Sequence, residues 1–110
     1  MKVEIISIGT LKEFVRQNVQ STKAVDLWIR TARRGDWNAP EDMMKTFPSM
    51  DLLGRNSRRM VFDLGGNKYR MICSYVFTLR RVRLYVCWIG THADYTKLCR
   101  KNMQFIISDY

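Results

Sequence analysis

The sequence contains no long apolar run. No stretch of its 110 residues approaches the roughly 20 consecutive apolar residues that a membrane-spanning helix needs. The first residues, Met1 to Glu4, also lack the pattern of positive charge followed by an apolar segment that marks a secretory signal. We therefore expect neither a membrane association nor export, and we expect a cytoplasmic protein.

Cysteine and histidine are scarce. The three cysteines, Cys73, Cys87 and Cys99, form an odd and widely spaced set, which argues against a disulfide framework. There is no CxxC pair and His92 is the only histidine, so a structural zinc site is not expected. The cysteines lie in or beside apolar segments, which is typical of packing residues rather than nucleophiles. This cysteine usage fits a reducing compartment.

Acidic residues are scarce in one half of the chain. The sequence has 19 Lys and Arg against 10 Asp and Glu, for a net charge of +9. Residues 2–51 hold 8 basic and 7 acidic side chains, whereas residues 55–101 hold 11 basic side chains and only Asp63 and Asp94. Such asymmetry favours a protein that binds a polyanion such as nucleic acid. The alternative is a charged face that only prevents aggregation.

The N-terminal half predicts one strand followed by helices. Residues 2–7 alternate as a β-strand does. Thr10 and Glu13 form a capping-box pattern that predicts a helix over residues 11–18. Apolar residues at helical spacing predict a second helix over residues 22–34.

A glycine and two prolines mark helix ends in the sequence. Gly35 fits the left-handed position that terminates the second helix. Pro40 predicts the first turn of a short third helix, which Pro48 closes.

The C-terminal half predicts an antiparallel sheet. Gly65, Gly66 and Asn67 tolerate positive φ and predict a tight hairpin turn. Thr91 predicts the N-cap of a helix that runs to about Arg100. Segments rich in β-branched and aromatic residues predict the strands. They are residues 60–64, 68–77 and 82–90, with residues 105–108 as a short edge strand or strand-like tail.

These elements predict an α+β fold in the order β-α-α-(α)-β-β-β-α. The N-terminal strand and helices are expected to pack on one face of an antiparallel sheet, because neither element can bury its apolar side alone. The other face would carry the basic residues. The length of 110 residues fits a single domain over residues 1–110.

Three segments carry a resemblance to a known family. Phe47 to Asp51, Val61 to Arg70 and Trp88 to Tyr95 together resemble the HigB branch of the RelE toxin superfamily. The similarity spans roughly residues 3–97, and the tail from Asn102 to Tyr110 extends beyond the family pattern.

The resemblance implies a RelE-like fold and a type II toxin-antitoxin toxin. Such proteins are mRNA interferases, endoribonucleases that usually cut mRNA on the translating ribosome and so inhibit translation. It also implies a HigA-like helix-turn-helix antitoxin as partner, with operator DNA contacted only through the antitoxin. It implies no metal and no organic cofactor.

Metal-free RNA cleavage needs groups for three tasks when the 2′-hydroxyl attacks phosphorus. One group accepts a proton, one stabilises the charge on phosphorus, and one protonates the leaving oxygen. Arg70 is the candidate for charge stabilisation, because a guanidinium makes two-point contacts to phosphate and the resemblance places an arginine at this point of the strand. The alternative is a solvated edge arginine.

His92 and Tyr95 are the other catalytic candidates. Histidine exchanges protons near neutral pH, although a lone histidine is more often structural. Tyr95 lies three residues later, on the same side of a helical turn, where it would donate a proton, stack on a base, or simply pack. Which of the two is the acid stays open, as does the existence of a general base.

Other basic residues are candidates for phosphate contacts. Expected RNA-binding residues are Lys68, Arg58, Arg59, Lys97 and Asn67. Arg80, Arg81 and Arg83, at the opposite hairpin end, are individually either contacts to ribosomal RNA or solvated charges.

Leu27, Trp28 and Trp88 are interpreted as core residues or antitoxin contacts. Alternation predicts that Trp88 shares one face of its strand with Leu84 and Val86.

Two other functional classes remain open from the sequence. A non-catalytic RNA- or DNA-binding module would account for the charge and the aromatic strands equally well. An inactive RelE-like regulatory partner is the second alternative. A metal enzyme fits least, because the basic half has few carboxylates.

Overall fold

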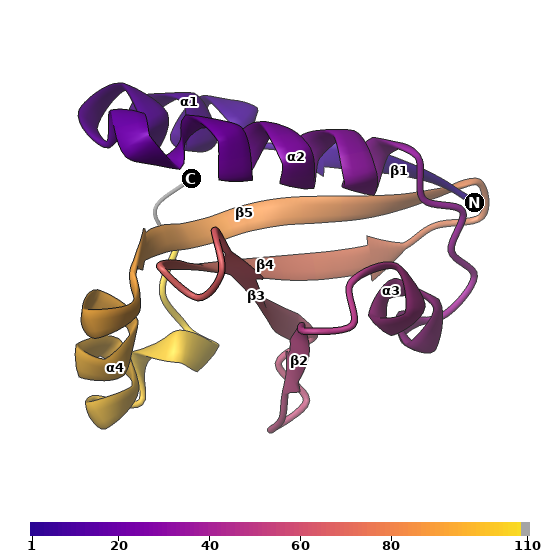
Figure 1. The fold of residues 1–110 in the computed structure, drawn as a ribbon. Coiled ribbons are helices and arrows are strands. Elements are labelled where there is room, and N and C mark those ends of the chain that lie inside the picture. The colour runs from indigo at the N-terminus through magenta and orange to yellow at the C-terminus, as the bar shows by residue number, and fades with distance from the viewer. Residues whose placement is uncertain (109–110) are drawn as a thin grey trace.

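A computed structural model describes residues 1–108 of the protein (Figure 1). Four α-helices, two short 3-10 helices and five strands follow one another along this part of the chain. Their bounds are β1 Lys2–Ile6, α1 Ile8–Gln17, η1 Val19–Ser21, α2 Thr22–Arg33, α3 Pro40–Thr46, β2 Asp51–Leu53, β3 Arg59–Leu64, β4 Tyr69–Phe77, β5 Arg81–Thr91, α4 His92–Arg100 and η2 Met103–Phe105. The α+β class is thus confirmed, and no helix in residues 1–108 is long and apolar enough to cross a membrane.

The five strands form one mixed sheet in the order β1-β5-β4-β3-β2. Three neighbouring pairs are antiparallel, but β1 pairs with β5 in parallel, so the expectation of an antiparallel sheet is correct only in part. A parallel pair needs a crossover, which α1 and α2 supply. The three-residue strand β2 was not predicted, because so short a segment carries no readable alternation.

Two expected helix ends differ from the structure. Helix α1 begins at Ile8, after Ser7 at φ 69°, so the capping box at Thr10 and Glu13 is not its start. Gly35 does not take the left-handed conformation either. A Cβ on Gly35 would lie 2.6 Å from the indole ring of Trp37, so a close approach and not the backbone angle requires glycine there.

Helix α3 begins as the sequence predicts. Pro40 occupies the first turn, and the Asp42 carboxylate accepts hydrogen bonds from the backbone N–H groups of Asn38 and Ala39. These bonds, with that of Asn38 largest, lower the pKa of Asp42.

The main core lies between the sheet and helices α1 and α2, which cover one face (Figure 1). The predicted apolar stripes of both helices point into it. Buried members include Leu11 of α1, Val25, Trp28 and Ala32 of α2, and Met60, Phe62, Met71, Cys73, Leu84 and Val86 of the strands. This face therefore holds most of the buried apolar surface that stabilises the fold.

A β-bulge changes which face the end of β5 presents. Ile72 pairs with Trp88 but Cys73 pairs with Val86, so Cys87 is an extra residue in β5. Trp88 consequently packs on the face opposite to Leu84 and Val86, and the expected shared face is wrong. There it joins a small second cluster that holds α4 and the tail against the sheet. The cluster consists of Val61, Ile72, Cys87 and Trp88, with Leu53, Tyr95, Leu98 and Ile107 against it.

The tail after α4 forms no strand in residues 101–108, so the edge strand expected at 105–108 is wrong. Instead the guanidinium of Arg59 donates to the backbone carbonyls of Gln104 and Ile107, at 3.3 and 2.7 Å. The last two residues of the chain, also part of the expected tail, lie outside the described residues.

Candidate active site on the open face of the sheet

The turn between β3 and β4 sets the register of the candidate site. Gly65, Gly66 and Asn67 all have positive φ, at 62°, 61° and 78°, as the predicted hairpin turn requires. This turn pairs Asp63 of β3 directly with Arg70 of β4. Both side chains point away from the main core, onto the face of the sheet that α1 and α2 leave open.

Arg70 is held on several sides. Its Nε lies 2.8 Å from Asp63 Oδ1, and its terminal nitrogen NH2 donates to Asn67 Oδ1 at 2.7 Å. The Nε–H is not aligned with any acceptor in residues 1–108, so the contact with Asp63 is an ion pair rather than a hydrogen bond. With its side chain only 17% exposed, the guanidinium has a restricted orientation.

Helix α4 brings two further candidates to the same end of the β4–β5 pair. The Thr91 hydroxyl accepts from the Asp94 backbone N–H at 3.1 Å, which confirms the predicted N-cap. The backbone N–H of His92 donates to the Lys68 carbonyl, so the exposed His92 is tied to the strand that carries Arg70. His92 and Arg70 therefore lie at one end of the sheet.

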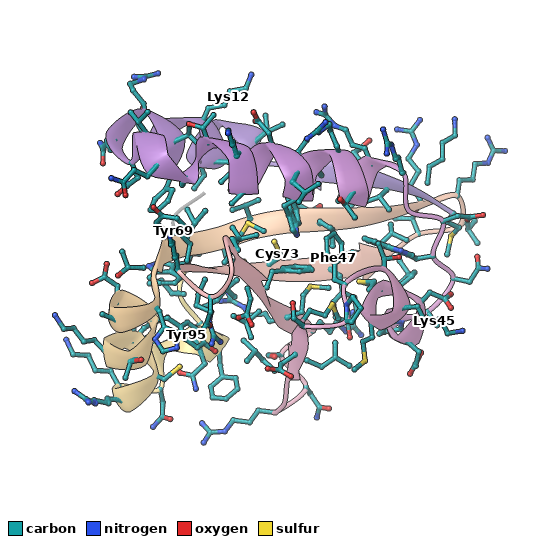
Figure 2. All side chains as sticks on the ribbon, viewed as in Figure 1. Lys12, Lys45, Phe47, Tyr69, Cys73 and Tyr95 are labelled. Carbon is teal, nitrogen blue, oxygen red and sulfur yellow. The ribbon has the colours of Figure 1, made fainter. Side chains whose placement is uncertain are left out.

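Tyr95 places its ring beside Arg70. Figure 2 shows the Tyr95 side chain next to α4. The guanidinium carbon of Arg70 lies 5.4 Å from the centre of that ring, and Trp88 flanks the ring at 6.1 Å between centroids. Partial burial raises the pKa of the Tyr95 hydroxyl well above its ordinary value, and the hydrogen bond with Cys99 and the electrostatic effect of that side chain raise it further, against an opposing effect of Arg70. The hydroxyl is therefore protonated at neutral pH and able to donate.

The expected RNA-binding residues divide into two groups. Lys68 and Asn67 are exposed at the hairpin turn, next to Arg70 in the chain. Arg58 and Arg59 lie at the other end of β3, roughly 15 Å away at about 3.3 Å per residue. Lys97 is exposed but projects about 200° around α4 from Tyr95. Arg59 differs from the others because its guanidinium also donates to the backbone carbonyls of the tail.

The cations at the far end of the open face are partly neutralised. Glu4 of β1 pairs with Arg81 at 2.7 Å and with Arg83 at 3.4 Å. Arg80 is exposed at the β4–β5 turn. These residues lie far along β5 from the Arg70 end of the sheet.

Metal-binding clusters and cavities do not coincide with this site. Residues 1–108 contain no group of three or more His, Cys, Asp or Glu side chains arranged to hold a metal ion. A cavity on the side of α2 is lined by Asp63 and Lys68 but not by Arg70, His92 or Tyr95. The candidate site is thus an open surface, which suits a long polymer substrate more than a small enclosed one.

Sequence reasoning missed several neighbours of Arg70. The sequence marks Asp63 only as one of two acids in the basic half, although the predicted hairpin sets it opposite Arg70. Asn67 is predicted to contact RNA, and the structure adds that its side-chain oxygen accepts a hydrogen bond from Arg70. Asp51 and Cys99 both raise the pKa of Tyr95, and their positions depend on how β2 and α4 pack on the sheet. Only Cys99 could be predicted as a neighbour of Tyr95 from the sequence, because it lies four residues later in the same helix.

Comparisons with known proteins place this chain in a family. Residues 21–98 match the HigB_toxin family, described as the RelE-like toxic component of a toxin-antitoxin system. The mRNA interferase HigB of Escherichia coli O6:H1 strain CFT073 is 32% identical over 98 residues, covering 89% of this chain and 93% of that protein. The mRNA interferase toxin HigB of Escherichia coli K12 and the mRNA interferase HigB of Shigella flexneri are each 25% identical over 93 residues, covering 84% of this chain and 88% of each relative. The chain therefore belongs to the HigB_toxin family of RelE-like toxins from toxin-antitoxin systems.

Proposed function

We propose that this chain is an endoribonuclease toxin that cleaves mRNA by attack of a 2′-hydroxyl on the adjacent phosphodiester. The observation that carries the proposal is the restrained guanidinium of Arg70 on an open face of the sheet. The ring of Tyr95, which carries a protonated hydroxyl, lies next to that guanidinium. Family membership and the names of the relatives support the same activity.

Arg70 stabilises the negative charge that develops on the phosphoryl oxygens in this mechanism. Asp63 and Asn67 hold Nε and one terminal nitrogen, which leaves the other terminal nitrogen for the phosphate. A preorganised donor is effective because little reorganisation is needed when the charge forms. Lys68 and Asn67, exposed on the turn, contact the flanking phosphates.

Tyr95 and His92 serve proton transfer. The raised pKa keeps the Tyr95 hydroxyl protonated at neutral pH, so we assign Tyr95 as the donor to the leaving 5′-oxygen rather than as the base. His92, exposed at the start of α4, then accepts the proton of the 2′-hydroxyl. No metal or organic cofactor takes part. The alternatives are a chain that only binds nucleic acid and an inactive regulatory relative.

The proposal also covers the domain, the location and the partners of the chain. The chain is a single RelE-like domain that acts in the cytoplasm, cuts mRNA on the translating ribosome, and is neutralised by a HigA-like helix-turn-helix antitoxin through which it reaches operator DNA. The exposed Arg58, Arg80 and Lys97 contact ribosomal RNA backbone, as do Arg81 and Arg83 next to Arg80.

The test is mRNA turnover by the antitoxin-free chain. A defined mRNA is incubated with the refolded protein, with and without ribosomes, and cleavage is mapped by primer extension. We expect substoichiometric protein to cut many transcripts when ribosomes are present. Binding of RNA without any cut, in both conditions, would replace the nuclease by a binding module.

A further inference from the structure

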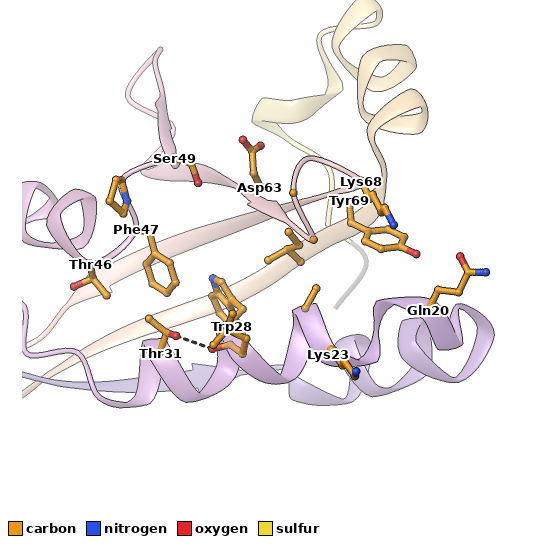
Figure 3. A pocket seen from close by; sticks show the side chains of 16 residues that line it. Gln20, Lys23, Trp28, Thr31, Thr46, Phe47, Ser49, Asp63, Lys68 and Tyr69 are labelled. Atoms are coloured by element: carbon orange, nitrogen blue, oxygen red, sulfur yellow. Dashed lines mark hydrogen bonds between the residues drawn. The ribbon is translucent and has the colours of Figure 1, made fainter.

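The cavity between α2 and the β3–β4 turn is separate from the face that carries Arg70 and Tyr95. It has a volume of about 560 Å³. Four segments line it: Gln20 of η1, the side of α2 that carries Leu27, the stretch from Thr46 to Ser49, and the β3–β4 turn with its flanking residues (Figure 3). Phe47, Trp28 and Tyr69 supply aromatic surface, and the size is typical of ligand and anchor pockets in proteins.

An exposed apolar side chain borders this cavity. Leu27 of α2 is 59% exposed, although it lies beside Trp28, which is 3% exposed. A large apolar side chain next to an open apolar cavity is typical of a protein-binding surface, where a partner inserts an anchor and covers the rim.

The rim of the cavity is positively charged. Lys23 lies on the helix side and Lys68 on the hairpin side (Figure 3). Neither lysine makes an ion pair within residues 1–108. The one acid in the lining, Asp63, pairs with Arg70, and Figure 3 shows its carboxylate pointing away from the cavity. An occupant with acidic groups would therefore complement both lysines.

We propose that this cavity is the docking site for an acidic, amphipathic segment of the antitoxin. An apolar side chain of that segment fills the space over Phe47 and Trp28 and contacts Leu27, while flanking Asp or Glu side chains pair with Lys23 and Lys68. The inference rests on the proposed function, since only a toxin has an antitoxin. It deepens that function by assigning the surface that the partner uses.

Docking here reaches the edge of the catalytic face, because it occupies Lys68, the proposed phosphate contact, but it leaves Arg70 and Tyr95 uncovered. Gly65, Gly66 and Lys68 of the β3–β4 turn line the cavity, and Asn67 of the same turn holds Arg70. A bound segment therefore contacts the turn that orients the guanidinium, while Arg70 and Tyr95 remain on the opposite side of the sheet.

The test compares two exposed leucines. Leu27→Glu adds a like charge to the acidic segment and removes an apolar contact, while Leu79→Glu makes the same change at the β4–β5 turn, where the side chain is fully exposed. The probe is the proposed HigA-like antitoxin, and its affinity is measured by titration calorimetry with each refolded full-length chain. We expect Leu27→Glu to weaken binding about tenfold or more, and Leu79→Glu to leave it unchanged.

A charge reversal gives an independent variant. Lys23→Glu should weaken binding about threefold to tenfold and reduce its dependence on salt, whereas Lys12→Glu, an exposed change on α1, should do neither. Circular dichroism checks that each variant is folded, and all four altered residues lie outside the catalytic face.

Cleavage of mRNA by the same free chains separates the inference from the function. Wild-type affinity in both Leu27→Glu and Lys23→Glu would overturn the docking site and leave the nuclease proposal untouched. Lost cleavage with intact antitoxin binding would also overturn it, because the cavity would then bind RNA. If no chain cleaves mRNA, the proposed function fails, while weakened binding in these two variants alone still supports the docking site.

Discussion

The two faces of the sheet differ in what their side chains do. The face under α1 and α2 is lined by apolar residues such as Met71, which is fully buried. The open face has a smaller apolar cluster and, beside it, the partly exposed ion pair of Arg70 and Asp63. Arg70 and Met71 are neighbours in β4, yet one faces the charged surface and the other the main core. Alternate residues of β4 therefore contribute to the stability of the fold and to the proposed cleavage of RNA.

The effects on mRNA cleavage and on stability should differ most at Arg70. Arg70→Ala removes the charge-stabilising donor and should lower the rate of mRNA cleavage about 10²–10³-fold. The free energy of unfolding should change by only about 1 kcal/mol, because the partly exposed Asp63 can be hydrated. Primer extension and urea denaturation measure the two quantities. Arg16→Ala, at an exposed arginine of α1, is the control, and an Arg70→Ala chain that cleaves like wild type would remove Arg70 from the mechanism.

A change at the neighbouring residue, Met71, should lower stability and leave cleavage unchanged. Met71→Ala empties space in the main core and should lower the free energy of unfolding by about 2–5 kcal/mol. At a temperature where the variant is still folded, cleavage should stay near the wild-type rate. Thermal and urea denaturation measure the loss. Unchanged stability would mean that this face does not carry the fold.

Tyr95 distinguishes a proton donor from a stacking ring. Tyr95→Phe keeps the ring beside Arg70 and Trp88 but removes the hydroxyl, so cleavage should fall about tenfold or more while RNA binding persists. Single-turnover rates and filter binding separate the two effects. Wild-type cleavage by the phenylalanine variant would leave Tyr95 only a packing or stacking role.

Asp63 should act through Arg70 rather than on RNA. Asp63→Asn keeps an oxygen beside Nε, so kcat should fall only about threefold, whereas Asp63→Ala should lower it about tenfold. KM should change less than kcat in both variants. Equal losses for the two variants, or a loss in KM alone, would argue against this positioning role.

Alkaline titration offers the smallest expected effect. The folded protein raises the pKa of Tyr95, so the unfolded chain ionises first as the pH rises above about 10 and the folded state binds more protons there. Stability contributed by this residue is complete below that pH and is lost above it. Tyr95→Phe should therefore show a weaker fall in unfolding free energy between neutral and alkaline pH. An identical fall in both chains would contradict the raised pKa.

Local patterns predicted the elements that local forces form. The turn at Gly65 and Gly66, the core stripe of α2 and the N-cap at Thr91 depend on residues close in sequence, and the structure confirms them. The turn also fixes the Asp63–Arg70 pairing, so part of the site was implicit in the sequence.

Features that depend on distant pairing were not readable. The parallel pairing of β1 with β5 is decided by which strand edge remains free, not by the residues of β1. The bulge at Cys87 moves Trp88 to the other face because β4 and β5 pair out of step there. The sequence predicts Arg59 as an RNA contact, and its hydrogen bonds to the tail depend on residues more than 40 positions away in the chain.

The ends of the cleaved RNA test the proposed chemistry most directly. Wild-type protein is incubated with ribosomes and a defined mRNA, the products are extracted, and their termini are identified by enzymatic end-labelling and mass spectrometry. Attack by the 2′-hydroxyl, aided by Arg70 and Tyr95, predicts a 5′-hydroxyl on one fragment and a 2′,3′-cyclic phosphate or its opened 3′-phosphate on the other. A 5′-phosphate with a free 3′-hydroxyl would contradict it, because water and not the 2′-hydroxyl would then have attacked phosphorus.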